Sequence, residues 1–547
     1  MTAEGGWTVG EDLRLRKGTE LRVLLGGQVH NSSSSSAAAI RESFAHAQRV
    51  NANTVLAPVS WALTEPREGV FDFALVDAML EEAARLELNL VLLWFGAFKN
   101  ATSTYAPRWV RADQERFPRA VVHPTTKGSA FHYSGVTPTP VLSVFSEALC
   151  AADGTAFEAL MRHLVESDES DVVALVQVEN ESGLLRDSRD RSDPAASAWA
   201  EGVPDALIAA AREGDEASLM HCLWVERGRR DGGTWSEVFG DSADADEVFM
   251  AWAIASYVER VAARGQAAKR IPMYANAWLG PQPGQEEPGQ WPSGGPSSRV
   301  IDVWRVAAPS LALVGPDIYV DDADSAMRDY ATGTQPFFVP ESRLRAGELV
   351  RAIGTHRAIG WSGFGIDGAN PDGQVAATFA YLTAFEHEIA RAQQQGRIGA
   401  VVVEPGTEVT EAPVGDLTVS ARSLNDIVRN FLLDVGVQLP DEALPVPDET
   451  LPREPVPTPG ETRPFALVFA EDDDSWIVVG QGVKLDFTAD DRVVEYDSVV
   501  ELLLGEDGIV PGRVLNGDER LQVVPVDRVG AARITLLRMA GGTHGSE

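Results

Sequence analysis

An apolar run at residues 172–178 leads directly into Glu179, Asn180 and Glu181. A run this short and rich in valine, without polar alternation, is typical of a strand buried on both faces, as in the parallel sheet of a barrel. In such barrels the functional side chains project from the carboxyl ends of the strands. The pattern therefore predicts a central parallel strand whose polar end lies at an active face.

Seven further apolar runs alternate with helical patterns over about the first 400 residues. This alternation predicts a parallel sheet with crossover helices, and eight strands suffice to close a (β/α)8 TIM barrel of the α/β class. Two long excursions, 99–144 and 184–246, interrupt the alternation, and we expect them to form pocket walls. The predicted strands are 21–26, 53–59, 88–95, 172–178, 271–277, 312–319, 336–340 and 359–366, and the predicted helices are 37–49, 75–86, 204–212 and 375–392.

A chain of 547 residues exceeds what one core usually supports, so at least two domains are expected. We assign residues 1–398 to the barrel and residues 463–547 to a smaller all-β domain, an antiparallel sandwich of short alternating strands. Residues 399–462 are expected to contain strands and a stiff linker or wrapping segment, because seven prolines fall between 440 and 459.

Composition excludes several classes of partner. The net charge of −35 would repel nucleic acid phosphates and anionic membrane surfaces. Neither a secretion signal nor an apolar window of about 18 residues is visible, which predicts a cytoplasmic protein. Cys150 and Cys222 do not make a disulfide framework, and a reducing compartment fits them best. The nine histidines are scattered, so neither a metal nor another cofactor is expected, and the oligomeric state stays open.

A second apolar run, residues 336–340, ends in Glu341, Ser342 and Arg343 far downstream of the first. Two glutamates at the mouths of two different strands are what hydrolysis of a glycosidic bond requires. Arg343, or an arginine brought in from elsewhere in the chain, is expected to favour the ionised form of Glu341, whereas Glu181 needs a raised pKa to hold a proton at neutral pH. The pair predicts an enzyme that acts on an oligosaccharide or another glycoside.

The segment Val176-Gln177-Val178-Glu179-Asn180-Glu181 resembles the fourth-strand segment of clan A glycoside hydrolases, and within that clan of the family 35 β-galactosidases. Residues 53–73, with Trp61 and the pair Glu65-Pro66, resemble the family's second-strand segment. The resemblance covers roughly residues 20–370. It implies that Glu181 is the general acid/base, that Asn180 holds the sugar 2-hydroxyl, and that Glu341 is the nucleophile of a retaining exo-glycosidase for terminal β-galactosides.

The sequence departs from the family pattern at positions that bind the sugar hydroxyls in the family. At the end of strand two, where the family usually has a tyrosine, it reads Ala57-Pro58-Val59. After strand three the family has Gly-Pro-Tyr leading to Glu-Trp, and here residues 94–100 read Trp-Phe-Gly-Ala-Phe-Lys-Asn. We therefore count Asn100 among the substrate-binding candidates and expect the chemistry to carry over better than the sugar specificity.

Five other residues are substrate-binding candidates. Trp61 and Trp361 are proposed as platforms for sugar rings, although ordinary core packing explains a tryptophan equally well. Tyr319 is expected to hydrogen-bond the nucleophile, with a structural tyrosine as the alternative. Glu179 shares one face of a regular strand with Glu181, and His30 follows the first strand, where a simple turn is the alternative.

Two other functions stay open. The same chemistry could act on a different β-glycoside, because the residues after strands two and three depart from the family. A carbohydrate-binding protein without turnover would keep the barrel, but the presence of both Glu181 and Glu341 argues against it.

Overall fold

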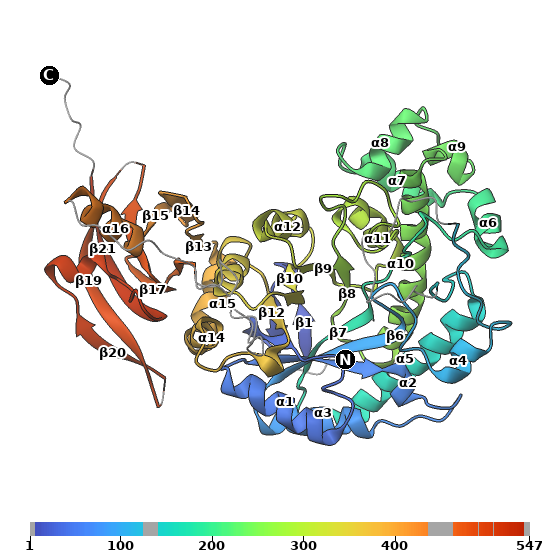
Figure 1. Ribbon diagram of the computed structural model, residues 1–547, viewed down its shortest axis with the longest axis horizontal. Helices are drawn as coiled ribbons and strands as arrows, with labels where there is room; N and C mark the ends of the chain where they lie inside the picture. Colours follow the sequence, from blue (N-terminus) through green and yellow to red (C-terminus); the bar gives the residue numbers. More distant parts are fainter. Residues whose placement is uncertain (1–5, 124–139, 436–462, 491, 507, 541–547) are drawn as a thin grey trace, which may run out of the picture.

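The computed structural model describes residues 6–123, 140–435, 463–490, 492–506 and 508–540. Eight parallel strands form a barrel, with helices in the connections between them (Figure 1). The seventh strand is divided at Pro340, which has no N–H to give to a ladder. The barrel strands are β4 (Leu24–Gln28), β5 (Thr54–Ser60), β6 (Asn89–Lys99), β7 (Val173–Asn180), β8 (Met273–Trp278), β9 (Leu313–Ile318), β10 (Phe338–Val339) with β11 (Glu341–Ser342), and β12 (Gly360–Phe364).

Pairing of the divided strand closes the barrel. β10 pairs with β12 and β11 pairs with β9, both in parallel, so the sheet runs from one half of the seventh strand around to the other. All eight strands lie where the apolar runs predict them, and the TIM-barrel prediction is confirmed. The expected helices are also present as α1 (Ala37–Arg49), α3 (Ala74–Arg85), α7 (Asp205–Glu213) and the consecutive pair α14 (Gln374–Ala384) and α15 (Glu386–Gln395).

A small antiparallel sheet that the sequence patterns did not predict closes the amino end of the barrel. It consists of β1 (Trp7–Val9), β2 (Leu15–Lys17) and β3 (Glu20–Leu21). Trp7 and Leu15 pack into one apolar cluster with the inward-facing residues of the barrel strands, and the indole of Trp7 donates to the carbonyl of Asp171 just before β7 (2.9 Å). A packed apolar core therefore closes the amino end of the barrel interior.

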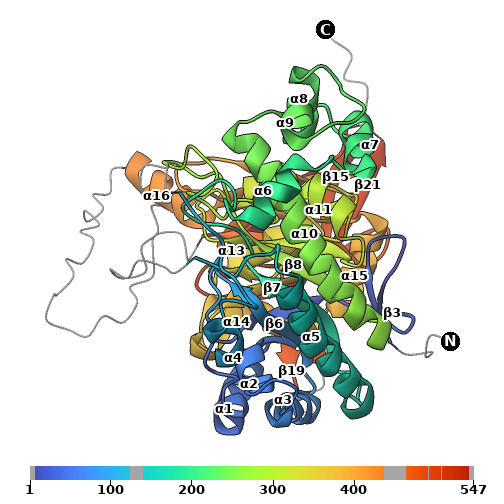
Figure 2. The same ribbon diagram turned by 90° about the vertical axis from the view of Figure 1, so that its right-hand side faces the viewer.

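The two predicted excursions carry helices. α4 (Arg108–Ala112) lies in the first, and α6 (Asp193–Ala200), α7, α8 (Leu219–Glu226) and α9 (Trp235–Phe239) lie in the second. Helices α6 to α9 gather at one end of the molecule, away from α1 and α3 (Figures 1 and 2). The longest helices are α5 (Glu147–Ser167) and α10 (Ala243–Ala268), and they pack on each other outside β6 and β7. Among the described helices, none combines the length and the apolar character needed to cross a membrane.

The C-terminal domain is antiparallel and begins earlier than the predicted boundary at residue 463. β13 (Ile398–Val402) pairs with β16 (Phe465–Ala470), so it belongs to the six-stranded sheet. A three-stranded sheet faces it, and the proline-rich stretch 440–459 lies outside the described residues. The other strands of the two sheets are β17 (Ser475–Gln481), β21 (Gly530–Ala540), β19 (Arg492–Gly505) and β20 (Gly508–Val514), and β14 (Thr410–Val414), β15 (Leu417–Ser423) and β18 (Val483–Thr488).

The sandwich and the barrel share one apolar core. The sandwich lies beside α14 and α15 (Figure 1), and residues of β16 and β17 fall in the same buried cluster as the barrel helices. The rings of Phe385 and Phe469 meet edge to face with their centroids 5.6 Å apart. The amide of Gln374 donates to that of Gln481 (2.9 Å) at the edge of this contact. The two domains are therefore packed together through apolar surface.

Candidate active site

Three carboxyl groups lie at the carboxyl ends of strands on one side of the barrel, β7, β9 and the divided seventh strand. Glu181 directly follows β7, Glu341 begins β11, and Asp317 lies opposite Glu341 in the β9–β11 register. Their residues are buried, with exposed fractions of 6%, 8% and 3%. Burial and the negative charge of Glu341 both raise the pKa of Glu181, so the two predicted glutamates are electrostatically coupled.

Glu181 has the environment of a group that holds a proton near neutral pH. Burial, with the charge of Glu341, raises its pKa to about 7. Hydrogen bonds from Asn100 and Asp317 oppose that shift, and the amide of Asn100 donates directly to the Glu181 carboxylate. The backbone N–H of Glu181 donates to the side-chain oxygen of Asn276 (3.0 Å), and the side-chain nitrogen of Asn276 donates to the carboxyl of Asp317 (2.6 Å). These contacts fix the carboxyl in one orientation.

Glu341 has one oxygen held and one oxygen open. The hydroxyl of Tyr319 donates to Oε1, as the sequence predicts, while Oε2 has no hydrogen-bond partner among the described residues. Burial raises the pKa of Glu341, and the Tyr319 hydrogen bond and the charge of Lys99 both act to lower it. The Tyr319 hydrogen bond and the Lys99 charge thus favour the ionised form against burial, and the free Oε2 is the kind of oxygen that attack on an anomeric carbon needs.

Lys99 is a site residue that sequence reasoning missed. It ends β6, is buried, and its ammonium lies 4.8 Å from the centroid of the Phe95 ring. Its charge lowers the pKa of Glu181, Glu341 and Asp317 alike. The one signal in the sequence was a lysine that closes an otherwise apolar strand.

Arg343 does not have the role expected for it. Its guanidinium pairs with Asp321 (2.9 Å) and donates to the carbonyl of Tyr319. It therefore supports the backbone behind the Tyr319 hydroxyl, and Lys99 supplies the positive charge that Glu341 senses.

Asn180 lies where the resemblance implies, at the end of β7 and next to Glu181. It is fully buried, and neither its side-chain nitrogen nor its side-chain oxygen has a hydrogen-bond partner among the described residues. A buried amide without partners is costly unless something else satisfies it. This amide is a candidate for binding a substrate hydroxyl.

The two tryptophan candidates belong to the core in this structure. Trp61 is buried, donates to the carboxylate of Glu65 (2.8 Å) and packs against Trp94 with centroids 6.5 Å apart. Trp361 is buried against Phe379 with centroids 6.0 Å apart. Neither indole presents a face to solvent, so the expectation that they are sugar platforms is corrected to core packing.

His30 lies at the rim, as its place after the first strand suggests. Its side chain is exposed at the end of β4, and Nδ1 is 2.8 Å from the carboxylate of Asp367 beyond β12. The ring meets Phe364 edge to face (5.3 Å). His30 and Asp367 thus join the first and last strands of the barrel beside the mouth.

Glu179 does not share the mouth with Glu181. Its carboxylate accepts hydrogen bonds from the backbone N–H groups of Ala97 (3.2 Å) and Phe98 (2.7 Å), and it lies against Asp153 of α5. The strand alternation behind the prediction fails because φ is +62° at Glu179 and +43° at Glu181. Two left-handed residues turn the side chains out of the regular pleat.

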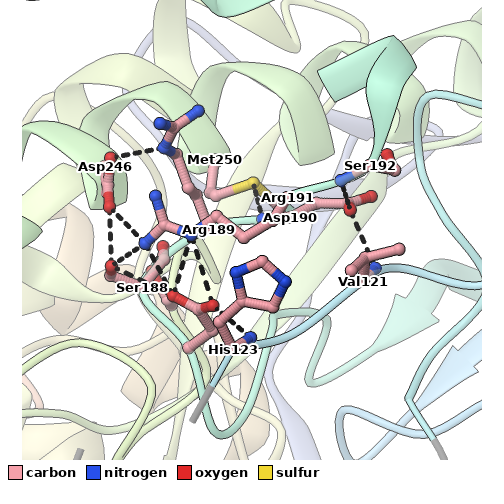
Figure 3. A network of polar contacts seen from close by, with 11 residues as sticks. Val121, His123, Ser188, Arg189, Asp190, Arg191, Ser192, Asp246 and Met250 are labelled. Atoms are coloured by element: carbon pink, nitrogen blue, oxygen red, sulfur yellow. Dashed lines mark hydrogen bonds and ion pairs between the residues drawn. The ribbon is translucent and has the colours of Figure 1, made fainter. Parts of the chain in front are cut away.

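The two excursions are joined to each other on one side of the barrel (Figure 3). Asp190 accepts from the N–H of Val121 (2.9 Å), and the N–H of His123 donates to Asp187 (2.7 Å). Asp246 of α10 pairs with two arginines of the second excursion, Arg189 and Arg191, both at 2.8 Å. These contacts hold residues of both excursions as one wall against α10.

Within the described residues, no group of three or more His, Cys, Asp or Glu side chains is placed to hold a metal ion.

Two family models match separate parts of the chain. One, described as beta-galactosidase (Glyco_hydro_42), matches residues 30–201, which include Lys99, Asn100, Asn180 and Glu181. The other, described as a domain of unknown function (DUF5597), matches residues 375–526 and begins within α14. The first match confirms the prediction of a glycoside hydrolase and supports its placement in clan A. None of the curated proteins compared with the chain matches it.

The solved structures that resemble the chain include two beta-galactosidases and a beta-mannanase. A beta-galactosidase from the Antarctic haloarchaeon Halorubrum lacusprofundi is 15% identical, with a TM-score of 0.39 over 68% of this chain and 58% of its own. A beta-galactosidase from Marinomonas ef1 is 12% identical, with a TM-score of 0.42 over 68% and 61%. A beta-mannanase from the blue mussel Mytilus edulis is 11% identical, with a TM-score of 0.38 over 72% and 96%.

Proposed function

We propose that the chain is a retaining exo-glycosidase that hydrolyses terminal β-linked galactosides by double displacement, in a divergent branch of the family 35 β-galactosidases. The observation that carries the proposal is a pair of buried glutamates whose surroundings differ, one directly after β7 and the other at the start of β11. Glu181 has a pKa of about 7, and Glu341 has a hydroxyl donor, a nearby cation and an open oxygen. One suits a proton donor and the other a nucleophile.

The proposed reaction has two steps. In the first, Oε2 of Glu341 attacks the anomeric carbon while Glu181 gives its proton to the departing glycosidic oxygen, which forms a glycosyl ester and a free alcohol. In the second, the ionised Glu181 takes a proton from water, whose oxygen attacks the same carbon and releases Glu341 as a carboxylate. Asn180 is proposed to hold the sugar 2-hydroxyl through both steps, with a bond that strengthens as positive charge develops on the ring.

Two observations bear on the sugar. The beta-galactosidase family match over residues 30–201 supports galactose. Lys99 and Asn100 stand in the segment that departs from the family 35 pattern, and both act on the carboxyl groups of the mouth, which favours a second candidate: the same chemistry on another β-glycoside.

A panel of nitrophenyl glycosides tests the proposal. We expect turnover of nitrophenyl β-galactoside, with retention of anomeric configuration in the first-formed product. Turnover of another β-sugar instead would replace galactose and keep the mechanism. Binding of sugars without turnover of any member of the panel would overturn the proposal in favour of a carbohydrate-binding protein.

The pH dependence of kcat/KM is expected to be bell-shaped. Glu181 must be protonated to act as an acid, so activity falls as the pH rises through about 7. Glu341 must be ionised, and because burial raises its pKa above the ordinary 4.5, the acid limb lies above pH 4.5. Initial rates on one nitrophenyl glycoside across this range check both limbs. A profile without a decline above neutral pH would contradict the role of Glu181.

Replacement of Lys99 by methionine roughly keeps the length of the side chain and removes its charge. Because Lys99 lowers the pKa of both glutamates, we expect both limbs of the kcat/KM profile to move to higher pH. The maximal rate should fall by roughly 10²-fold, the usual loss when one electrostatic stabiliser is removed. Lys269→Met is the matched control, since Lys269 pairs with Asp168 (3.3 Å) just before β7 and away from the mouth. A profile that Lys99→Met leaves unmoved would exclude Lys99 from the site.

A further inference from the structure

The ladder between β6 and β7 is interrupted just before the active site. Trp94 pairs with Val178, and the next paired residues are Lys99 and Asn180. Between these two pairs β6 advances by five residues while β7 advances by two. The extra residues of β6 form a bulge whose backbone N–H groups are buried and have no strand partner in that register. Something other than the ladder must hold the bulge in shape.

Two buried carboxyl groups accept hydrogen bonds from the bulge and hold it in shape. Glu179 accepts from the N–H of Ala97 (3.2 Å) and of Phe98 (2.7 Å). Asp153, from α5, accepts from the N–H of Ala97 (3.3 Å) and from the indole of Trp94 (2.9 Å). Because both carboxyls accept from the same N–H of Ala97, they lie against each other. The bulge is thus closed around a carboxyl pair.

Gly96 provides the space for the two carboxyl groups. A Cβ atom on Gly96 would lie 2.5 Å from Oε1 of Glu179 and 2.7 Å from Oδ1 of Asp153, closer than real contacts allow. The left-handed conformation of Glu179, at φ +62°, turns its side chain sideways into the bulge. Both features are costly for an ordinary strand, and both serve to bring the carboxyls into the bulge.

Two buried carboxyl groups in contact cannot both be ionised, so the pair holds one proton. Asp153 already accepts from three donors. They are the indole of Trp94, the N–H of Ala97 and the hydroxyl of Tyr257 on α10, the last at 2.7 Å. Burial and the charge of Asp153 raise the pKa of Glu179 well above its ordinary value. The proton therefore belongs to Glu179, which donates it to the carboxylate of Asp153.

We propose that Glu179 and Asp153 form a one-proton carboxylic acid–carboxylate lock that holds the β6 bulge and thereby positions Lys99 and Asn100 against Glu181. The bulge runs directly into Lys99 and Asn100, and beyond it the N–H of Ala101 donates to the carbonyl of Glu181 (3.1 Å). The register of these residues against β7 is set by how many residues the bulge takes up. Glu179 and Asp153 are positioning residues, since neither is part of the mouth.

Conservative and disruptive variants separate the lock from ordinary packing. Glu179→Gln keeps a donor for Asp153 and an acceptor for the backbone, so kcat/KM should stay close to the wild-type value. Glu179→Leu removes one carboxyl of the pair, and Gly96→Ala pushes the pair out of the bulge. We expect both variants to lose roughly 10²-fold in kcat/KM, the usual result of a displacement of about 1 Å at the reacting groups. These two variants should also move the basic limb of kcat/KM to higher pH, because Lys99 and Asn100, which lower the pKa of Glu181, would be displaced.

Asp246→Asn is the matched control for loss of a buried carboxylate. Asp246 pairs with Arg189 and Arg191 in the wall (Figure 3), and its replacement should lower Tm without moving the basic limb. The lock is overturned if Glu179→Leu lowers Tm and leaves both the rate and the limb unchanged, or if Glu179→Gln is as damaging as Glu179→Leu.

Infrared difference spectra test the lock without turnover, which matters because the activity readouts rest on the proposed function. Wild type minus Glu179→Gln should contain the C=O band of a protonated carboxyl that persists well above pH 7. The pKa of Glu181, followed through the band lost in Glu181→Gln, should rise when Glu179→Leu is added. If the wild type turns over no glycoside, the proposed function fails while these spectra still decide the lock; if the Glu179 band is absent, the lock fails whatever the activity.

Discussion

Glu341→Ala is expected to abolish turnover, with a loss of roughly 10⁴-fold or more in kcat, the scale seen when a nucleophile is removed from its catalytic unit. The covalent step has no substitute, because the hydroxyl of Tyr319 and the charge of Lys99 then surround an empty position. Azide fits the space of the missing carboxylate and should restore turnover of a nitrophenyl β-glycoside. The product should be the α-glycosyl azide, since azide attacks from the face that Glu341 occupied.

Glu348→Ala is the control for this variant. Glu348 is another buried glutamate, on α13 (Ala346–Val350), with a pKa raised by burial to about 7 and an ion pair to Arg345 (3.3 Å). Its loss should lower Tm and leave kcat nearly unchanged. Recovery of a β-glycosyl azide from Glu341→Ala, or a kcat as high as that of Glu348→Ala, would remove Glu341 from the role of nucleophile.

Glu181→Ala should show a loss that depends on the leaving group. For a poor leaving group the missing proton costs about 10²–10⁴-fold in kcat/KM, whereas dinitrophenolate departs unaided, so the first step with that substrate should be nearly normal. The second step then lacks its base and the glycosyl-enzyme accumulates, which a burst of dinitrophenolate reveals. The decline of kcat/KM above neutral pH should disappear, because the group with a pKa of about 7 is gone.

Azide again identifies the missing group. With Glu341 intact, azide attacks the glycosyl-enzyme from the face that Glu181 served, and the product should be the β-glycosyl azide. A uniform loss for good and poor leaving groups alike would argue that the variant has damaged the mouth rather than removed a proton donor. Tm of the variant distinguishes a local change from unfolding.

The sequence predicted those parts of the structure that periodicity controls. Eight apolar runs became eight strands, and the glutamates at the ends of two of them became neighbours, because parallel strands in a closed barrel bring their carboxyl ends to one face. Tyr319 reached Glu341 for the same reason, since β9 and β11 pair in register. Strand order and burial were enough to predict these contacts.

The missed features depend on local departures from regular geometry. The bulge in β6 and the positive φ of Glu179 turned a side chain expected in the mouth into the bulge itself. The same bulge set the register that puts Lys99 at the site, and strand periodicity contains no information about inserted residues. Trp61 and Trp361 were misassigned because a tryptophan in a strand or after it gives no signal of which way its ring packs.

The apolar contact between α14, α15 and the sandwich constrains the order of events during synthesis. The last barrel strand ends at residue 364, yet Phe385, between α14 and α15, packs against Phe469 of β16, which begins at residue 465. During synthesis, a complete set of barrel strands is therefore made well before the strand that covers this apolar flank. A gene shortened to the barrel alone would leave that flank exposed to solvent.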